Sequence, residues 1–219
     1  MKKLFFTITT LCISSAAILA QDAPVDANNR TDFRERLLFG LKVGANYANV
    51  YDVKAEAFRA DPKFGFVTGI FVAIPIGKLI GLQPEVLFSQ KGFQGNGNLL
   101  GANYDFSRTT SYLDIPLLFS IKPTEFITIL AGPQYSYLLS QKDVTNYGDI
   151  SISDETQFSN SNLRKNTLCF TGGFDFTMKH FVVGLRIGWD LQKNDGDGNN
   201  GTMTYKNTWY QGTIGYRLY

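Results

Sequence analysis

The sequence predicts an all-β fold, a single eight-stranded antiparallel up-and-down transmembrane β-barrel over residues 37–219. Three observations predict it. Strand-like segments of about ten residues alternate apolar and polar side chains, the connections between them alternate long and short, and the charges within the strands share one parity. In an outer-membrane barrel the apolar parity faces lipid and the polar parity faces the interior, whereas a soluble sheet packs its apolar face inward.

The N-terminus has the composition of a secretory signal peptide, residues 1–20. Lys2 and Lys3 precede an apolar run over residues 4–19, and Ala20 is a small residue at the predicted cleavage point. We therefore expect cleavage near Ala20 and localisation in the cell outer membrane. Residues 21–36 are polar and aperiodic, and we interpret them as a flexible periplasmic lead-in.

The charge and cysteine content narrow the function classes. Removing Lys2 and Lys3 with the signal peptide leaves 19 basic residues against 19 acidic ones, so no nucleic-acid partner is expected. Only Cys169 remains of the two cysteines, which precludes an internal disulfide. We interpret Cys169 as a small residue within a strand.

Eight strand-like segments follow one another along the chain. They are residues 37–48, 64–75, 81–92, 110–122, 125–139, 166–178, 181–192 and 206–219. The second is apolar on both parities, so its facing stays open, and no helical period competes in any of them. In the other seven, the apolar parity holds, in order, Leu41 and Val43; Val86 and Phe88; Ile115 and Phe119; Ile129 and Tyr135; Leu168 and Phe174; Leu185 and Ile187; and Ile214 and Tyr216.

The polar parity of the strands carries equal numbers of acidic and basic side chains. They are Lys42, Lys91, Arg186 and Arg217, with Glu85, Asp114, Asp175 and Asp190. Charges confined inside a barrel need partners, so we expect a structural interior charge network. Because an eight-stranded barrel is just wide enough to be filled by side chains, a self-satisfied plug is favoured over a polar conduit.

The third segment, "GLQPEVLFSQKG", contains one residue that fits a strand poorly. Leu82, Val86 and Phe88 should face lipid, while Pro84 lacks a backbone donor for the sheet. We therefore expect a bulge or local irregularity at Pro84.

Two kinds of connection join the segments. Residues 49–63, 93–109, 140–165 and 193–205 are long and rich in Asn, Asp, Gly and Ser, whereas 76–79, 123–124 and 179–180 are tight turns. Outer-membrane barrels have long external loops and short periplasmic turns, so the long connections are candidate sites for protein partners. Aromatic residues near strand ends, among them Tyr112, Tyr205 and Trp209, are expected at the headgroup level.

No catalytic, cofactor or metal site is expected. His180 lies in a predicted short turn and is interpreted as a solvated residue. The loop at 194–201 has Asn200 and Lys206 where a calcium loop needs Gly and Glu. Residues 92–101 lack the Lys-Ser/Thr end of a phosphate loop and are interpreted as a surface loop.

Several stretches together resemble a known family. They are "GLKVGANYANV", "GLQPEVLFSQKG", "YLDIPLLFSIKP" and "AGPQYSYLLS". These resemble the outer-membrane β-barrel family of Bacteroidota that includes PorT-like proteins, over residues 37–219. The end, "GTIGYRLY", resembles the terminal strand that the barrel-assembly machinery engages. The resemblance implies a barrel of about eight strands without a known catalytic centre, in a family of which some members act in secretion across the outer membrane.

The sequence therefore favours a small outer-membrane barrel with a structural or protein-interaction role and no catalytic activity. Its expected partners are outer-membrane lipid, the assembly machinery during biogenesis and proteins at the long loops. A narrow channel or transporter is the main alternative. A lipid-modifying enzyme and a soluble lipocalin-like binder are weaker ones.

Overall fold

The computed structural model describes residues 33–51, 60–99, 102–147, 150–157, 165–193 and 205–218. Its elements are the 3-10 helix η1 (Phe33–Glu35) and the strands β1 (Leu38–Tyr51), β2 (Asp61–Pro75), β3 (Ile80–Leu99), β4 (Ala102–Ile121), β5 (Ile127–Tyr147), β6 (Ile150–Gln157), β7 (Asn166–Met178), β8 (Phe181–Asp190) and β9 (Lys206–Leu218). The predicted signal peptide and the loop at 194–201 lie outside the described residues. No helix in the described ranges is long and apolar enough to cross a membrane.

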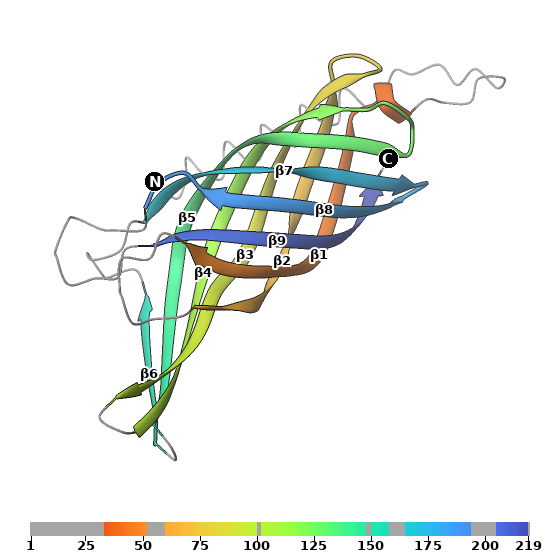
Figure 1. Ribbon diagram of the computed structural model, residues 1–219. Coiled ribbons are helices and arrows are strands. Elements are labelled where there is room, and N and C mark those ends of the chain that lie inside the picture. The colour runs from red at the N-terminus through yellow and green to blue at the C-terminus, as the bar shows by residue number, and fades with distance from the viewer. Residues whose placement is uncertain are drawn as a thin grey trace, which may run out of the picture. The chain divides into compact units, whose positions relative to one another are not determined.

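Eight of the strands form a closed antiparallel ring (Figure 1). The order is β4-β3-β2-β1-β9-β8-β7-β5, and pairing of β4 with β5 closes it. Successive strands are neighbours, as their direct connections allow, and β9 returns to pair with β1. The predicted eight-stranded antiparallel barrel is therefore confirmed. The ninth strand, β6, pairs with the far end of β5 and adds to the wall without entering the ring.

Side-chain exposure alternates along the ring strands in the sense expected for a membrane barrel. In β8, Leu185 is 48% exposed and Ile187 39%, whereas Arg186 between them is 6% exposed. Most of the large exposed side chains of the ring strands are aliphatic or aromatic, an arrangement that water would penalise and lipid favours. The ambiguous β2 follows the same rule, since Phe66 and Ile70 face outward and Val67 inward.

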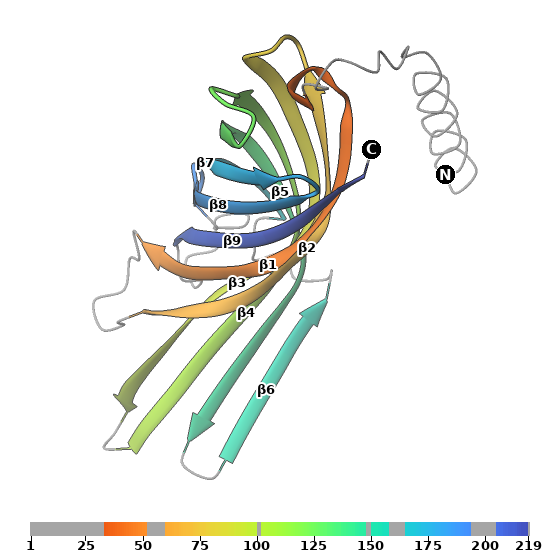
Figure 2. The ribbon, with the colours of Figure 1, turned by 90° about the vertical axis from the view of Figure 1, so that its right-hand side faces the viewer.

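Two predicted loops are strands instead. Residues 93–99 of β3 pair with 102–108 of β4, and residues 140–147 of β5 pair with β6. Their Asn, Gly and Ser content is unusual for strands and predicts loops. Unbroken pairing with the neighbouring strands nevertheless extends the sheet through these residues. We call these four paired segments the wing; it projects beyond the ends of the other strands (Figures 1 and 2).

The bulge expected at Pro84 is absent. The register stays constant across this residue, with Leu82 facing Phe119 and Leu87 facing Asp114. Register shifts occur elsewhere, between Pro62 and Val67 in β2 and at Ser111/Tyr112 where β4 meets β5. Both lie toward the wing, where the strands leave the ring.

The end of the predicted flexible lead-in is ordered. Residues 33–35 form η1, and the Lys122 side chain donates a hydrogen bond of 3.2 Å to the carbonyl oxygen of Arg34. This contact places η1 at the end of the barrel that carries the tight turns, which we call the short-turn end.

Candidate functional site in the barrel lumen

Four charged residues from four strands form one cluster toward the short-turn end, which we call the four-residue ion network. Lys42 of β1 lies 2.7 Å from Glu85 of β3, and Arg186 of β8 lies 2.7 Å from Asp175 of β7. Arg186 also approaches Glu85 at 3.9 Å, which joins the two pairs. Two cations and two carboxylates balance, and each side chain is at least 94% buried. This arrangement arises because each of the four residues occupies an inward position of its strand, and the four positions lie at a similar level along the barrel.

Neutral groups supply part of the hydrogen bonding of these charges. Gln83 donates to Glu85 at 2.9 Å and to Asp175 at 3.3 Å. Arg186 donates to the carbonyl oxygen of Phe174 at 3.0 Å. These hydrogen bonds offset part of the cost of burying the four ions, although Nε and Nη2 of Arg186 have no hydrogen-bond partner among the described residues.

A second cluster lies toward the wing and centres on Lys91. Its ammonium group is 3.0 Å from Asp114 and 3.7 Å from the centre of the Trp209 ring, with Tyr112 at 4.9 Å. The indole fits because Gly188 faces it across β8 and β9, and a Cβ at Gly188 would overlap the ring. The ion pair and the aromatic faces hold Lys91 in the middle of the lumen.

Asp190 lies at this end of the lumen, and its carboxylate accepts hydrogen bonds mainly from neutral groups. It accepts hydrogen bonds from the backbone and side-chain nitrogens of Asn207, at 2.8 and 2.6 Å. The buried thiol of Cys169 donates to it at 3.1 Å and lies 3.4 Å from the Ser136 hydroxyl. Cys169 is therefore a small buried residue within strand β7, and it also makes polar contacts that the sequence did not indicate.

A neutral layer separates the two charged clusters. Asn46 donates to the Ser89 hydroxyl at 2.9 Å and accepts from Gln211 at 3.0 Å. These residues carry no charge, so the pattern of charged side chains on the polar parity does not point to them. Buried amides on the same parity were the available signal.

An aromatic cluster lines the lumen at the wing end. Val50, Phe93 and Tyr205 pack together, with Phe93 and Tyr205 ring centroids 5.3 Å apart. Arg108 of β4 lies over these rings and makes two hydrogen bonds to Asp143 of β5, at 2.8 and 2.7 Å. The bidentate pair ties β4 to β5 beside the aromatic cluster.

Three aromatic residues are not where the sequence analysis expected them. Tyr112, Tyr205 and Trp209 were expected at the headgroup level, yet they are 2%, 1% and 1% exposed. Each occupies the inward parity of its strand, where it fills space that a small barrel cannot leave empty. Position near a strand end was therefore a weaker guide than parity.

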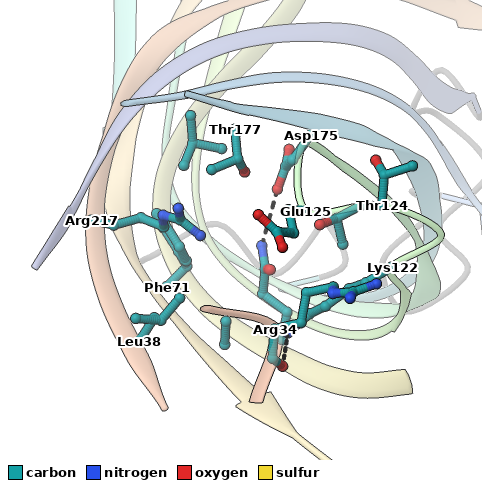
Figure 3. Close-up of a pocket in the computed structure, with 13 residues that line it drawn as sticks. Arg34, Leu38, Phe71, Lys122, Thr124, Glu125, Asp175, Thr177 and Arg217 are labelled. Atoms are coloured by element: carbon teal, nitrogen blue, oxygen red, sulfur yellow. Dashed lines mark hydrogen bonds between the residues drawn. The ribbon is translucent and has the colours of Figure 1, made fainter. Parts of the chain in front are cut away.

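Arg217 lies apart from both clusters. Its guanidinium donates a 2.6 Å hydrogen bond to the carbonyl oxygen of Lys179 at the short-turn end. It lines a small recess, open to solvent, together with Arg34, Lys122 and Glu125 (Figure 3). Asp175 of the four-residue ion network also lines this recess and is held there by its hydrogen bond with Gln83.

The described residues offer no assembled catalytic or metal-binding group. His180 stacks on Tyr216 with ring centroids 5.2 Å apart, and its Nδ1 lies 3.2 Å from the carbonyl oxygen of Arg217. Within the described ranges no three His, Cys, Asp or Glu side chains are grouped to hold a metal ion. The arrangement can fill and brace a barrel, and its charges are engaged with one another.

Comparisons with known proteins identify the family. Residues 19–196 match the model of the outer membrane protein beta-barrel domain, and no curated protein matches the sequence. Among solved structures, Ail of Yersinia pestis is 15% identical with a TM-score of 0.42 and covers 83% of this chain and 98% of its own. OprG of Pseudomonas aeruginosa is 15% identical with a TM-score of 0.40, covering 85% and 99%.

The outer membrane protease OmpT of Escherichia coli is 11% identical with a TM-score of 0.42, covering 83% of this chain and 95% of its own. Likenesses this distant carry no argument about activity. The family match covers most of the chain and agrees with the closed ring, its apolar outer surface and its polar interior. The chain therefore belongs to the family of outer membrane protein beta-barrel domains, and is a small β-barrel of the outer membrane.

Proposed function

We propose that this barrel is a non-catalytic outer-membrane anchor whose lumen is filled and whose wing meets protein partners. The observation that carries the proposal is the layered filling of the lumen. The four-residue ion network, the Asn46 layer, the Lys91–Trp209 contact and the Phe93–Tyr205 cluster follow one another toward the wing. An ion crossing the barrel would have to displace each layer, including buried and paired charges.

Conductance separates this role from that of a channel or transporter. The chain refolded into planar bilayers should give no steady current. Removing both the bulk and the charge of one layer, as in Lys91→Gly/Trp209→Gly, should give small current steps because two facing side chains disappear. Sustained current from the wild-type barrel, with the folded fraction checked on unheated gels, would instead establish the channel function.

The free edge of β6 supports an interaction role. Among the described strands β6 pairs with β5 alone, so its other edge presents backbone donors and acceptors. Exposed edges of this kind accept an added strand from a partner. Ile152 of β6 is 56% exposed and offers an apolar contact beside that edge.

A crosslinking experiment with one matched pair of variants tests the β6 edge. A photocrosslinker at Ile152 should capture specific proteins from intact outer membranes. Ser153→Pro, which removes one backbone donor from β6, should abolish capture, whereas Ser153→Ala should preserve it. Equal capture by both variants would show that strand addition is not the mode of binding.

We further propose that the wing faces the cell exterior and the short-turn end faces the periplasm, as is general for outer-membrane barrels. Single cysteines at Asn96 in the wing and at Lys78 in the turn after β2 test this, because the remaining Cys169 is fully buried. A membrane-impermeant maleimide should label only the Asn96 variant on intact cells. Labelling of the Lys78 variant alone would reverse the orientation.

The family resemblance supports two further proposals. The terminal strand would guide insertion by the barrel-assembly machinery, and the barrel would assist secretion across the outer membrane. Deletion of the chain followed by comparison of secreted proteins tests the second. An unchanged set of secreted proteins would leave the anchor role without the secretion link.

A further inference from the structure

The outward face of the wall changes its chemistry in steps from the barrel into the wing. On β4 the outward side chains from Ile121 to Leu113 are apolar, over a length that matches a membrane-spanning strand of about 9–11 residues. The next positions on this face are Ser111, Thr109 and Ser107. The apolar belt therefore ends below Thr109, and the face continues above it as a polar surface.

Two lysines lie on either side of Thr109. Lys63 donates hydrogen bonds of 2.6 Å to the Thr109 hydroxyl and 2.7 Å to the Ser107 hydroxyl. It reaches them across Gly92, which faces Thr109 in β3 and has no side chain to block it. Lys142 of β5 faces Thr109 from the opposite side. We call these three residues, Lys63, Thr109 and Lys142, the lysine rung.

The two lysines bring two positive charges to the two sides of Thr109. Burial lowers the pKa of Lys63, and the positive charge of Lys142 lowers it further. Among residues with described side chains, no carboxylate lies within ion-pair distance of the Lys63 ammonium group, whereas Lys142 faces Glu155 of β6 in the register of the sheet. An anion placed over Thr109 would relieve the repulsion between the two cations.

Above the lysine rung the same face becomes a hydrogen-bonding surface. Gln94 faces Ser107, and Asp105 faces both Asn96 and Asn146 across its two neighbouring strands. These side chains and Asp61 line a shallow recess of about 350 Å³ that is open to solvent. Amide groups supply donors and acceptors together, which suits ligands rich in hydroxyl groups. The two carboxylates would repel a second anion and confine negative charge to the lysine rung.

We propose that this face docks the headgroup of a phosphorylated glycolipid of the surrounding outer leaflet. A phosphate would lie on the lysine rung, and the sugars would lie over the Gln94, Asn96 and Asn146 side chains. We choose a membrane glycolipid because the order of surfaces along the wall matches the order of groups in such a lipid. Acyl chains would lie on the apolar belt, a phosphate on the two lysines and sugars on the amide side chains. In the cell, the inference also rests on the proposed external orientation of the wing.

Binding to the detergent-solubilised full barrel tests the site independently of orientation. Phosphorylated glycolipid should bind wild type at least about tenfold more tightly than Lys63→Gln/Lys142→Gln, and rising salt should narrow the difference. The matched control is Lys78→Gln/Lys179→Gln, which removes two exposed lysines from the short-turn end and should bind as wild type does. Lys63→Arg/Lys142→Arg should restore most of the affinity because it keeps both charges.

A second lipid and a second double variant test phosphate binding and sugar recognition separately. Phosphatidylglycerol should bind more weakly than the glycolipid, and Asn96→Ala/Asn146→Ala should reduce glycolipid affinity while leaving phosphatidylglycerol unaffected. Equal binding of the two lipids would overturn sugar recognition, and equal loss in both lysine double variants would overturn the site. Each variant is compared as folded protein on unheated gels. Failure of the cysteine-labelling experiment with intact binding would refute the orientation alone.

Discussion

At the scale of single residues, parity decides which side chains meet lipid and which fill the lumen. Leu87 illustrates this, since it is apolar yet lies on the inward parity of β3 and is 2% exposed. Parity also placed the charged residues inside, because a strand offers only two faces. It could not tell which charges would pair, since pairing depends on register between strands distant in sequence, as for Lys42 and Glu85.

The outward face of β3 can be tested with one charge. Val86 is 41% exposed and lies one outward position from the middle of the apolar belt. Val86→Lys should lower the free energy of unfolding in bilayers by about 2 kcal/mol, toward the lower end of the cost for a lysine at mid-bilayer. Gln94→Lys, which adds the same charge in the wing, should change it little. Equal stability of the two variants would contradict the lipid-facing assignment.

The four-residue ion network predicts a strongly non-additive pair of substitutions. Lys42→Met leaves Glu85 buried with Arg186, 3.9 Å away, as its remaining cation and should destabilise the barrel by about 3–5 kcal/mol. Adding Glu85→Gln removes the unpaired charge and should recover much of that loss. Urea unfolding of both single variants and the double variant in the same lipid measures the coupling. Additive losses would show that the two residues act independently.

At the scale of elements, the main difference between sequence and structure is the wing. Asn, Gly and Ser predict loops because they are poor strand formers on average, and residues 93–109 contain many of them. Register with a pre-existing wall overrides that preference, as the unbroken pairing from Lys91 and Thr110 to Leu99 and Ala102 shows. The same local rules failed at Pro84, where flanking pairs keep the register without a bulge. Neighbours in the sheet, which one strand's sequence does not reveal, decided both cases.

The part of the wing formed by β3 and β4 should therefore be dispensable for folding of the ring. Replacing residues 96–105 with Asn-Gly would connect Gly95 to Phe106, which already face each other, through a two-residue hairpin turn. We expect the shortened chain to refold with a free energy of unfolding within about 1 kcal/mol of wild type, because the lipid-facing belt is intact. Failure to form the compact species on unheated gels would show that the wing nucleates the barrel.

At the scale of the whole molecule, closure depends on β1 meeting β9. The side-chain pattern of one segment suffices to predict a strand. Closure, however, requires the backbones of β1 and β9, which lie far apart in the sequence, to approach closely. Gly44 marks that approach, since a Cβ there would overlap the carbonyl oxygen of Gly212. The closed ring leaves no unpaired edge within the bilayer, which is a condition for spanning it with strands.

Blocking this seam should prevent closure. Gly44→Val places a branched side chain against β9 and should abolish the heat-modifiable, fast-migrating form of the barrel. Ala45→Val is the matched control, because Ala45 points outward from the same strand and is exposed. A normal fast-migrating band from Gly44→Val would show that the seam has room that the structure does not reveal.

The two tryptophans stand on opposite sides of the wall, and this gives the chain a natural pair of optical reporters. Trp189 shares the outward parity of Ile187, whereas Trp209 is enclosed beside the Lys91 ammonium. Lipids brominated along their acyl chains should quench the emission of Trp189 as the barrel inserts and leave that of Trp209 bright. Single-tryptophan variants could then time insertion and filling of the interior as separate events during one refolding reaction.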